Sequence, residues 1–240
     1  MKTIGLLGGM SWESTVTYYQ LLNREIGRQL GGVHSAQVVL LSVDFQEIET
    51  LQHRGEWDRL GEILTGHART LEKAGAEFLV ICTNTMHLVA PAIEGGISIP
   101  LRHIADATAE RIKAEGMTRV ALLGTRFTME EPFYRGRLET EHGLTVLVPP
   151  PIDREIVHRV IYEELVLGQI RQESRDEFIR ISDDMARAGA EGVILGCTEI
   201  GLLLKQEDSG VALFDTSVIH AEAAAAMALK DAADSVGGGR

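Results

Sequence analysis

The sequence has few of the residues that build cross-links or structural metal sites. It contains two cysteines, Cys82 and Cys197, and thiols of cytoplasmic proteins stay reduced, so we expect no disulfide. Two thiols are too few for a structural zinc site, and no two histidines lie four residues apart as a helical metal-ligand pair would. We therefore predict a protein without a metal ion.

Basic residues and long apolar runs are also scarce. Lys and Arg number 23 against 35 Asp and Glu, a net charge of −12, which argues against nucleic-acid and anionic-membrane partners. No apolar run approaches the roughly 20 residues of a membrane span, and the N-terminus lacks the apolar region of a signal peptide. We predict a cytoplasmic protein whose partner is a small molecule, which backbone N–H groups could hold even if it is anionic.

Short apolar runs alternate with helical patterns along the 240 residues. This alternation predicts an α/β fold with parallel sheets. The predicted strands cover residues 3–8, 37–43, 78–81, 119–125, 144–148, 192–195 and 211–215. The predicted helices cover 11–30, 57–73, 106–115, 131–141, 153–167, 174–188 and a last segment to about 233, before a frayed tail at 237–240. The strand at 37–43 is almost entirely apolar, which predicts cover on both of its faces.

Two halves of the chain resemble each other. Ala74-Gly75-Ala76-Glu77, followed by an apolar run, recurs as Ala188-Gly189-Ala190-Glu191, and 188 minus 74 gives an offset of 114. Leu6-Leu7-Gly8 recurs as Leu122-Leu123-Gly124 at an offset of 116, a drift that loop insertions explain. We predict two similar parallel-sheet domains related by a pseudo-twofold axis. Their expected bounds are 1–100 plus 211–240, and 101–210.

The offset of 114 makes Thr83 the counterpart of Cys197. Both follow a predicted strand, and ligands of open α/β sheets bind beyond the carboxyl ends of strands, so we expect the two residues to face one cleft between the domains. Acid/base groups on opposite faces of one carbon are what inversion of a stereocentre requires. Cys197 precedes a predicted helix, whose positive end should lower the pKa of the thiol.

Other residues near these turns have simpler explanations. Cys82 lies one place before the position that matches Cys197, so it should point to the opposite side of its strand and into a core. His87 is expected to pack near the turn rather than to act as a base. Gly8 and Gly9 either serve packing in a turn or let the backbone approach a ligand, and they match neither the GxGxxG nor the Walker pattern. Cys197 by itself could be a small core residue; its matched partner favours a shared site.

Three motifs together resemble the cofactor-independent aspartate/glutamate racemase superfamily, over nearly the whole chain. They are Leu6-Leu-Gly-Gly-Met10, Asn84-Thr85-x-His87 and Gly196-Cys-Thr-Glu199. The resemblance implies two similar domains with the active site between them, no pyridoxal phosphate or metal, and frequent homodimers. It implies that Cys197 acts on the α-proton of the L-enantiomer. Substrate-binding residues that it suggests are Met10, Gln46, Asn84, Thr85, Thr125, Thr128, Thr198 and Glu199.

The chain departs from this family pattern at the first-half cysteine, which is Thr83. A hydroxyl can donate or relay a proton but is a poor general base. A lysine of some members is missing near 161–168, where Val166 falls, and so is an arginine near Gln46. We expect a racemase of acidic amino acids, biased toward deprotonating the L-form. The alternatives are a one-thiol decarboxylase of the same superfamily and a non-catalytic amino-acid-binding protein.

Overall fold

A computed structural model of the chain describes residues 1–236, and the predicted tail at 237–240 lies outside them. The chain divides into two compact units. Unit 1 comprises Met1–His103 and the segment from His220 onward, and unit 2 comprises Ile104–Ile219. Within residues 1–236 no helix combines the length and the apolar character needed to cross a bilayer.

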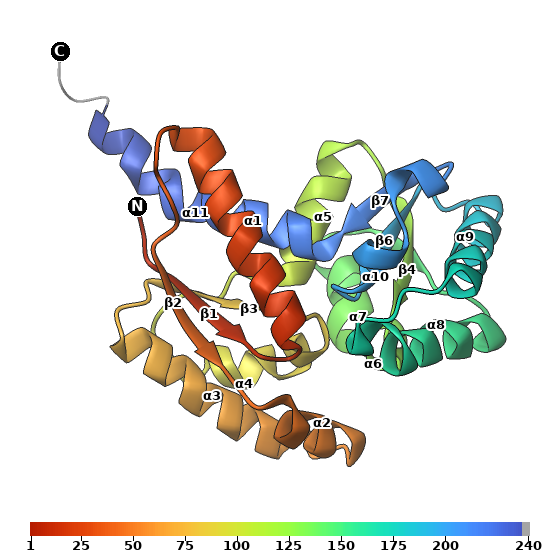
Figure 1. The fold of residues 1–240 in the computed structure, drawn as a ribbon, viewed down its shortest axis with the longest axis horizontal. Helices are drawn as coiled ribbons and strands as arrows, with labels where there is room; N and C mark the ends of the chain where they lie inside the picture. The colour runs from red at the N-terminus through yellow and green to blue at the C-terminus, as the bar shows by residue number, and fades with distance from the viewer. Residues whose placement is uncertain (237–240) are drawn as a thin grey trace. The chain divides into compact units, whose positions relative to one another are not determined.

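Unit 1 is built on a three-stranded parallel sheet (Figure 1). The strands are β1 (Ile4–Gly8), β2 (Val38–Ser42) and β3 (Phe78–Ile81), in the order β2-β1-β3. The helical segments are α1 (Trp12–Leu30), α2 (Phe45–His53), α3 (Trp57–Lys73), the 3₁₀ segment η1 (Thr85–Val89), α4 (Ala90–Glu94) and most of α11 (Thr216–Val236). The expected helices at 11–30 and 57–73 are confirmed, with Ser11 as N-cap accepting from the Ser14 N–H.

Alternate residues of the strands face different helices because successive side chains point to opposite faces of a sheet. Ile4 and Leu6 of β1 pack with residues of α1 and α11 in one buried cluster. Leu7 packs with residues of α3 and α4 in another. Figure 1 shows α1 and α11 on one side of the sheet and α3 on the other.

The second strand differs from its prediction. Residues of β2 are partly or substantially exposed, and Leu40 is 45% exposed. The expectation that both faces of this strand are covered holds in part: Val38 packs against the cluster that contains α1 and α11, and Val39 and Leu41 pack against the cluster that contains α3. None of them is fully buried, because β2 is an edge strand that pairs only with β1 in this sheet.

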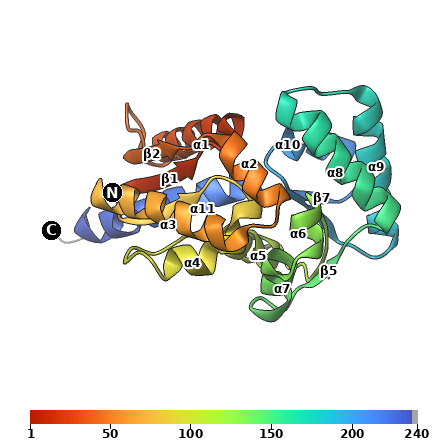
Figure 2. The same ribbon diagram turned by 90° about the horizontal axis from the view of Figure 1, so that it is seen from below.

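Unit 2 contains a four-stranded parallel sheet in the order β5-β4-β6-β7. Its strands are β4 (Arg119–Gly124), β5 (Thr145–Leu147), β6 (Gly192–Gly196) and β7 (Ala212–Asp215). Its helical segments are α5 (Ile104–Ala114), α6 (Arg126–Glu130), α7 (Pro132–Thr140), α8 (Pro151–Glu163), η2 (Leu165–Leu167), α9 (Gln172–Arg187), α10 (Ile200–Leu203) and η3 (Gln206–Asp208). Helices α8 and α9 lie side by side (Figures 1 and 2).

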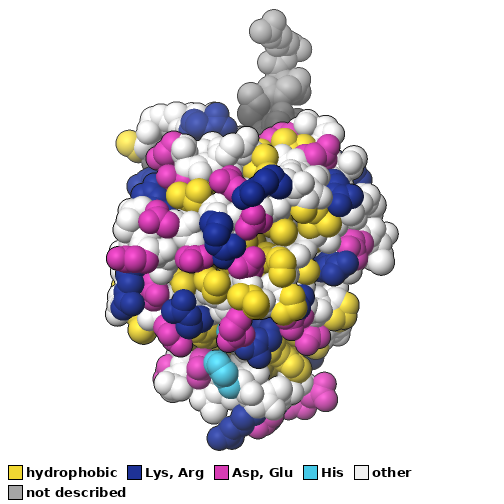
Figure 3. Space-filling view, turned by 90° about the vertical axis from the view of Figure 1, so that its right-hand side faces the viewer, with side chains coloured by type: hydrophobic (Ala, Val, Ile, Leu, Met, Phe, Trp, Pro, Cys, Tyr) yellow, Lys and Arg dark blue, Asp and Glu magenta, His cyan; other side chains and the backbone are white. Residues whose placement is uncertain are grey.

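Charged residues of both signs are interspersed on the face of the molecule that Figure 3 shows. In unit 2 the Arg180 guanidinium lies 2.6 Å from the Asp153 carboxylate and 2.7 Å from the Glu177 carboxylate. These neighbouring carboxylates raise the pKa of Arg180. The positive charge of Arg180 is thus compensated by the carboxylates on both sides of it.

The duplication predicted from the sequence is present in the strand registers. The order β2-β1-β3 in unit 1 corresponds to β5-β4-β6 in unit 2. Leu7 pairs with Ile81 in the first sheet, and Leu123 pairs with Leu195 in the second. Leu7 and Leu123 are related by the offset of 116, and Ile81 and Leu195 by the offset of 114. The pairing of strands therefore reproduces both offsets found in the sequence.

Matching glutamates strengthen this correspondence. Glu77 accepts a hydrogen bond from the Thr3 N–H at 2.6 Å, at the start of β1. Its counterpart Glu191 accepts from the N–H groups of Thr118 and Arg119 at 2.7 and 2.8 Å, at the start of β4. These N–H groups lower the pKa of Glu191. The two halves therefore share a side-chain contact as well as a strand order.

The domain bounds expected from the sequence need correction at the second crossing. Residues 211–240 were expected to belong to the first domain, but β7 pairs with β6 in the second sheet. The Phe214 ring packs over Gly192, where a Cβ would lie 2.6 Å from it. The chain therefore enters unit 1 at His220, and the first crossing falls after His103 rather than after residue 100.

In unit 1, a single β-bridge takes the place that β7 has in unit 2. Leu101 pairs with Leu79 in parallel, as Leu213 pairs with Val193 in unit 2. The bonds from Leu79 N–H to Pro100 C=O and from Arg102 N–H to Leu79 C=O, both 2.9 Å, complete the bridge. Because proline has no N–H, residue 100 cannot donate to a longer ladder.

Candidate active site

The candidate residues of unit 1 all follow the carboxyl ends of strands. Met10 follows β1, Gln46 follows β2, and Thr83, Asn84 and Thr85 follow β3. Since β2, β1 and β3 are neighbours in one parallel sheet, these residues lie along one edge of that sheet, the edge where α/β proteins bind ligands.

The turn after β1 is held by a buried threonine. The Gly9 N–H donates to the Thr15 hydroxyl at 2.8 Å, and that hydroxyl donates to the Ser11 carbonyl at 2.9 Å. Gly9 has φ of 91°, and a Cβ there would lie 2.3 Å from the Val43 carbonyl oxygen. Glycine is therefore required by packing in this turn, the simpler of its two expected roles. Met10, 4% exposed, is held between these fixed residues.

The turn after β3 separates a core thiol from a partly exposed hydroxyl. Cys82 is fully buried in the cluster with Ile4 and Leu6, as predicted, and burial raises the pKa of its thiol. Thr83, the next residue, is partly exposed. Asn84 takes the N-cap position of η1, but its side chain makes no capping hydrogen bond there.

Gln46 lies just beyond the carboxyl end of β2 in unit 1. It is exposed in the first turn of α2, where its N–H donates to the Asp44 carboxylate at 3.1 Å. Its side-chain amide donates to the Thr50 hydroxyl at 3.3 Å. These contacts belong to the start of the helix, so the structure leaves a substrate contact of Gln46 as a prediction.

In unit 2, the turn after β4 is a capped helix start. Thr125 is the N-cap of α6, its hydroxyl accepting from the Thr128 N–H at 3.3 Å, and the two hydroxyls lie 3.1 Å apart. Thr128 is fully buried. Ser11 and Ser14 repeat this arrangement at the start of α1, with hydroxyls 3.4 Å apart. Neither serine was predicted as a site residue, although 125 minus 11 and 128 minus 14 both give the repeat offset of 114.

The turn after β6 brings the second thiol next to a carboxylate. The Cys197 thiol donates to Glu199 Oε2 at 2.9 Å, and the Thr198 hydroxyl donates to the same oxygen at 2.8 Å. Cys197 and Thr198 are partly exposed, whereas Glu199 is buried. The predicted residues Cys197, Thr198 and Glu199 thus form one hydrogen-bonded group.

The expected lowering of the Cys197 pKa was wrong. Burial, the negative charge of Glu199 and the hydrogen bond to its side chain raise the pKa of Cys197 well above its ordinary value. Hydrogen bonds from the N–H groups of Thr198 and Glu199 lower this pKa but are outweighed. The helix that follows, α10, has only four residues, so its dipole is small compared with an adjacent carboxylate.

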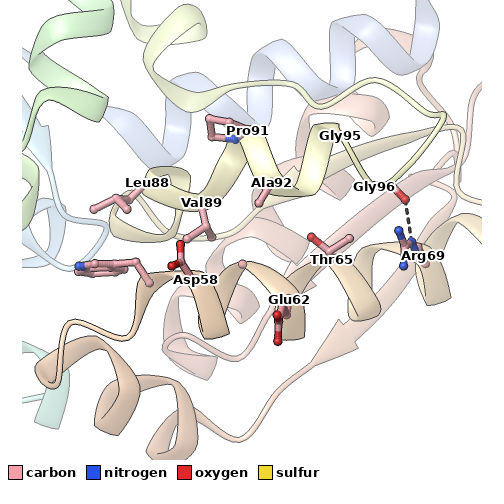
Figure 4. A pocket seen from close by; sticks show the side chains of 12 residues that line it. Asp58, Glu62, Thr65, Arg69, Leu88, Val89, Pro91, Ala92, Gly95 and Gly96 are labelled. Atoms are coloured by element: carbon pink, nitrogen blue, oxygen red, sulfur yellow. Dashed lines mark hydrogen bonds between the residues drawn. The ribbon is translucent and has the colours of Figure 1, made fainter.

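Unit 1 also contains a groove of about 560 Å³ that is separate from these residues. It lies between α3 and α4 and is lined by Asp58, Glu62, Arg69 and small or apolar residues that include Val89 and Ala92 (Figure 4). The Arg69 side chain spans one end and donates to the Gly96 carbonyl at 2.8 Å. None of the predicted site residues lines this groove.

Comparison with known proteins identifies the family of this chain. The family model of the Asp/Glu/hydantoin racemases matches residues 7–224. The chain belongs to the Asp/Glu/hydantoin racemase family. Racemases are isomerases, so this is a family of isomerases, and the resemblance found in the sequence is confirmed.

Solved structures share both fold and sequence with this family member. A Yersinia pestis protein described as an Asp/Glu racemase is 53% identical with a TM-score of 0.91, the match covering 95% of this chain and 100% of that one. An aspartate racemase homologue from Pyrococcus horikoshii OT3 is 38% identical with a TM-score of 0.82, covering 95% and 99%. The broad specificity amino-acid racemase RacX of Bacillus subtilis (strain 168) is 22% identical over 173 residues, 69% of this chain and 70% of RacX.

Proposed function

We propose that this family member racemises acidic amino acids, aspartate or glutamate, without a cofactor, and that it preferentially deprotonates the L-enantiomer. The observation that carries the proposal is the thiol–carboxylate pair of Cys197 and Glu199 at the carboxyl end of β6. Thr83 supports it by lying at the matching position after β3. The position matches because Ile81 and Leu195 pair with corresponding residues of β1 and β4.

Cys197 is proposed to remove the α-proton of the L-substrate. Its raised pKa means that the resting residue is a thiol at neutral pH. Glu199 already accepts the hydrogen bond from this thiol, so it is the group to which the thiol proton can move. The thiolate formed then takes the α-proton, and the electron pair of the C–H bond remains on the substrate as a planar carbanion.

Thr83 is proposed to deliver a proton to the opposite face of that carbanion. The proposal requires the Thr83 hydroxyl and the Cys197 sulfur to flank one carbon atom, as in the cleft expected from the sequence. A hydroxyl can donate this proton but removes one poorly from the D-enantiomer. Since the two enantiomers are equally stable, kcat/KM must be the same in both directions. The difference between a thiol and a hydroxyl therefore predicts a higher kcat from L to D than from D to L, offset by a higher KM for the L-enantiomer.

Substrate recognition is proposed to use the polar residues at the same strand ends. These are Asn84, Thr85, Thr125, Thr128, Thr198 and Glu199, with Met10 and Gln46 beside them. The family is that of the Asp/Glu/hydantoin racemases, and one similar protein is an aspartate racemase homologue; both support an acidic substrate. The broad specificity of RacX makes neutral amino acids the necessary comparison. A homodimer, as the resemblance implies, stays a prediction.

The test is a substrate panel in deuterated water. The purified protein is incubated with L- and D-aspartate, L- and D-glutamate and both enantiomers of alanine. Chiral chromatography then measures the enantiomers, and mass spectrometry measures deuterium at the α-carbon. We expect deuterated D-product from L-aspartate or L-glutamate, with a kcat at saturating substrate that exceeds the kcat of the reverse reaction.

Two results would replace the proposal. Tight ligand binding with no deuterium at any α-carbon would identify a binding protein. Release of carbon dioxide from a substituted malonate, with no racemisation of amino acids, would identify a one-thiol decarboxylase. Equal kcat values for the two enantiomers at saturation would retain a racemase but contradict the unequal roles of Cys197 and Thr83.

A further inference from the structure

Three histidines that are far apart in the sequence are buried together in unit 1. His87, His103 and His220 are 1%, 3% and 0% exposed. The ring centroid of His87 lies 4.5 Å from that of His103 and 5.8 Å from that of His220. The proposed proton transfer uses none of these rings, yet one of them contacts the turn that carries Thr83.

His87 is hydrogen-bonded to the main chain of that turn. Its Nδ1 lies 2.8 Å from the Thr83 carbonyl oxygen. A carbonyl oxygen only accepts, so Nδ1 carries the hydrogen and donates. The neutral ring is therefore the Nδ1–H tautomer, with Nε2 as its acceptor atom.

His220 is fixed in the opposite tautomer. Its Nε2 lies 2.7 Å from the Arg102 carbonyl oxygen, so Nε2 carries the hydrogen. Its Nδ1 lies 2.8 Å from the Tyr18 hydroxyl, which then donates to it. The Tyr18 and His220 rings meet edge to face at 89°, and together these contacts fix one wall against which His87 packs.

We propose that His87 is a positioning residue for Thr83, held in place by the rings of His103 and His220. The inference rests on the proposed racemase activity for its consequence. The peptide between Thr83 and Asn84 is planar, so a bond at the Thr83 carbonyl fixes the plane of the peptide that leaves Thr83. It thereby fixes the backbone from which the Thr83 hydroxyl projects, at the point where β3 ends.

The role is specific to one face of the reaction. Deprotonation by Cys197 and return of a proton to the same face give deuterium exchange in recovered L-substrate without Thr83. Formation of the D-product needs a proton from the opposite face and so depends on the position of Thr83. Loss of the His87 contact should therefore lower the ratio of D-product formation to exchange, whereas general destabilisation would lower both together.

The first measurement reads the tautomers directly and does not depend on activity. Long-range ¹H–¹⁵N correlation spectra of the histidine rings distinguish Nδ1–H from Nε2–H, and His87→Asn assigns the His87 signals by their loss. We expect Nδ1–H for His87 and Nε2–H for His220 at neutral pH. An Nε2–H tautomer for His87 would overturn the inference even if the protein racemises aspartate.

The second measurement compares variants of His87. His87→Asn keeps an N–H donor near the place of Nδ1 and should keep the ratio of D-product formation to exchange within about threefold of the wild type. His87→Leu removes the donor and should lower this ratio about tenfold or more, the size of effect that a small misplacement of a reacting group produces. His53 makes the same type of bond, from Nδ1 to the Glu49 carbonyl four residues earlier at 3.0 Å, but on the exposed helix α2. His53→Leu is thus the matched control and should leave the ratio unchanged.

The outcomes separate this inference from the proposed function. An unchanged ratio in His87→Leu, or an equal fall of product formation and exchange, would overturn the positioning role. The positioning role would also be overturned if His87→Asn lowered the ratio of D-product formation to exchange as much as His87→Leu does. Absence of any exchange in the wild type would instead reject the proposed function, while the tautomers could still be read by NMR.

Discussion

The turn after β1 gives a prediction whose magnitude follows from two hydrogen bonds. The Thr15 hydroxyl, in a residue that is 3% exposed, accepts from the Gly9 N–H and donates to the Ser11 carbonyl. Thr15→Val keeps the shape of the side chain and removes both bonds. A buried N–H without its partner costs about 1–3 kcal/mol, and loss of the second bond adds about 1 kcal/mol. We expect unit 1 to lose about 2–4 kcal/mol of stability.

Thr15→Ser is the control, because it keeps the hydroxyl and removes only the methyl group that contacts Gly8. Loss of a buried methyl group costs about 1 kcal/mol. Both tryptophans of the chain, Trp12 and Trp57, belong to unit 1. Urea unfolding followed by tryptophan fluorescence therefore reports the stability of this unit separately. If Thr15→Val were as stable as Thr15→Ser, the hydroxyl would not hold the turn as described.

Two further predictions concern the reacting groups. Glu199→Gln removes a negative charge that raises the pKa of Cys197. The pKa of Cys197 should therefore fall, and its alkylation by iodoacetamide at pH 8 should become faster. An unchanged or slower alkylation would contradict the role given to Glu199. Cys82 serves as the internal control, since its burial should leave it unreactive in both proteins. Thr83→Cys supplies a second thiol and should raise kcat for the D-substrate, measured at saturation, about tenfold or more relative to kcat for the L-substrate, within the range of general-base effects. An unchanged ratio of the two kcat values would show that the residue at 83 does not limit the reverse reaction.

Much of the fold follows from local pattern in the sequence. The apolar spacing of 57–73 gave α3 with its bounds, and the helix expected at 11–30 is α1 with Ser11 as its N-cap. The apolar run at 37–43 correctly located β2, but it predicted a more complete burial of the strand than the structure shows. Edge position depends on which strands pair, and composition of one strand does not contain that information.

The site residues that could be predicted are those that the internal repeat relates to one another. The offset of 114 located Thr83 and Cys197, and it would have located Ser11 and Ser14 had it been applied to Thr125 and Thr128. The pKa of Cys197 was misjudged because the direction of the Glu199 side chain is set by tertiary structure. The contact of His220 with the ring of His87 joins residues more than a hundred positions apart, and no pattern in the sequence links them.

The residue on which the proposed chemistry depends most is Cys197. Serine in its place keeps nearly the same shape but forms almost none of the deprotonated base at neutral pH, because a hydroxyl is much less acidic than a thiol. The decisive measurement is α-deuterium incorporation into L-aspartate and L-glutamate by Cys197→Ser in deuterated water, beside the wild type and Cys82→Ser. We predict that exchange and D-product formation are lost in Cys197→Ser and retained in Cys82→Ser; exchange that persists at the wild-type rate in Cys197→Ser would contradict the assignment of Cys197 as the base.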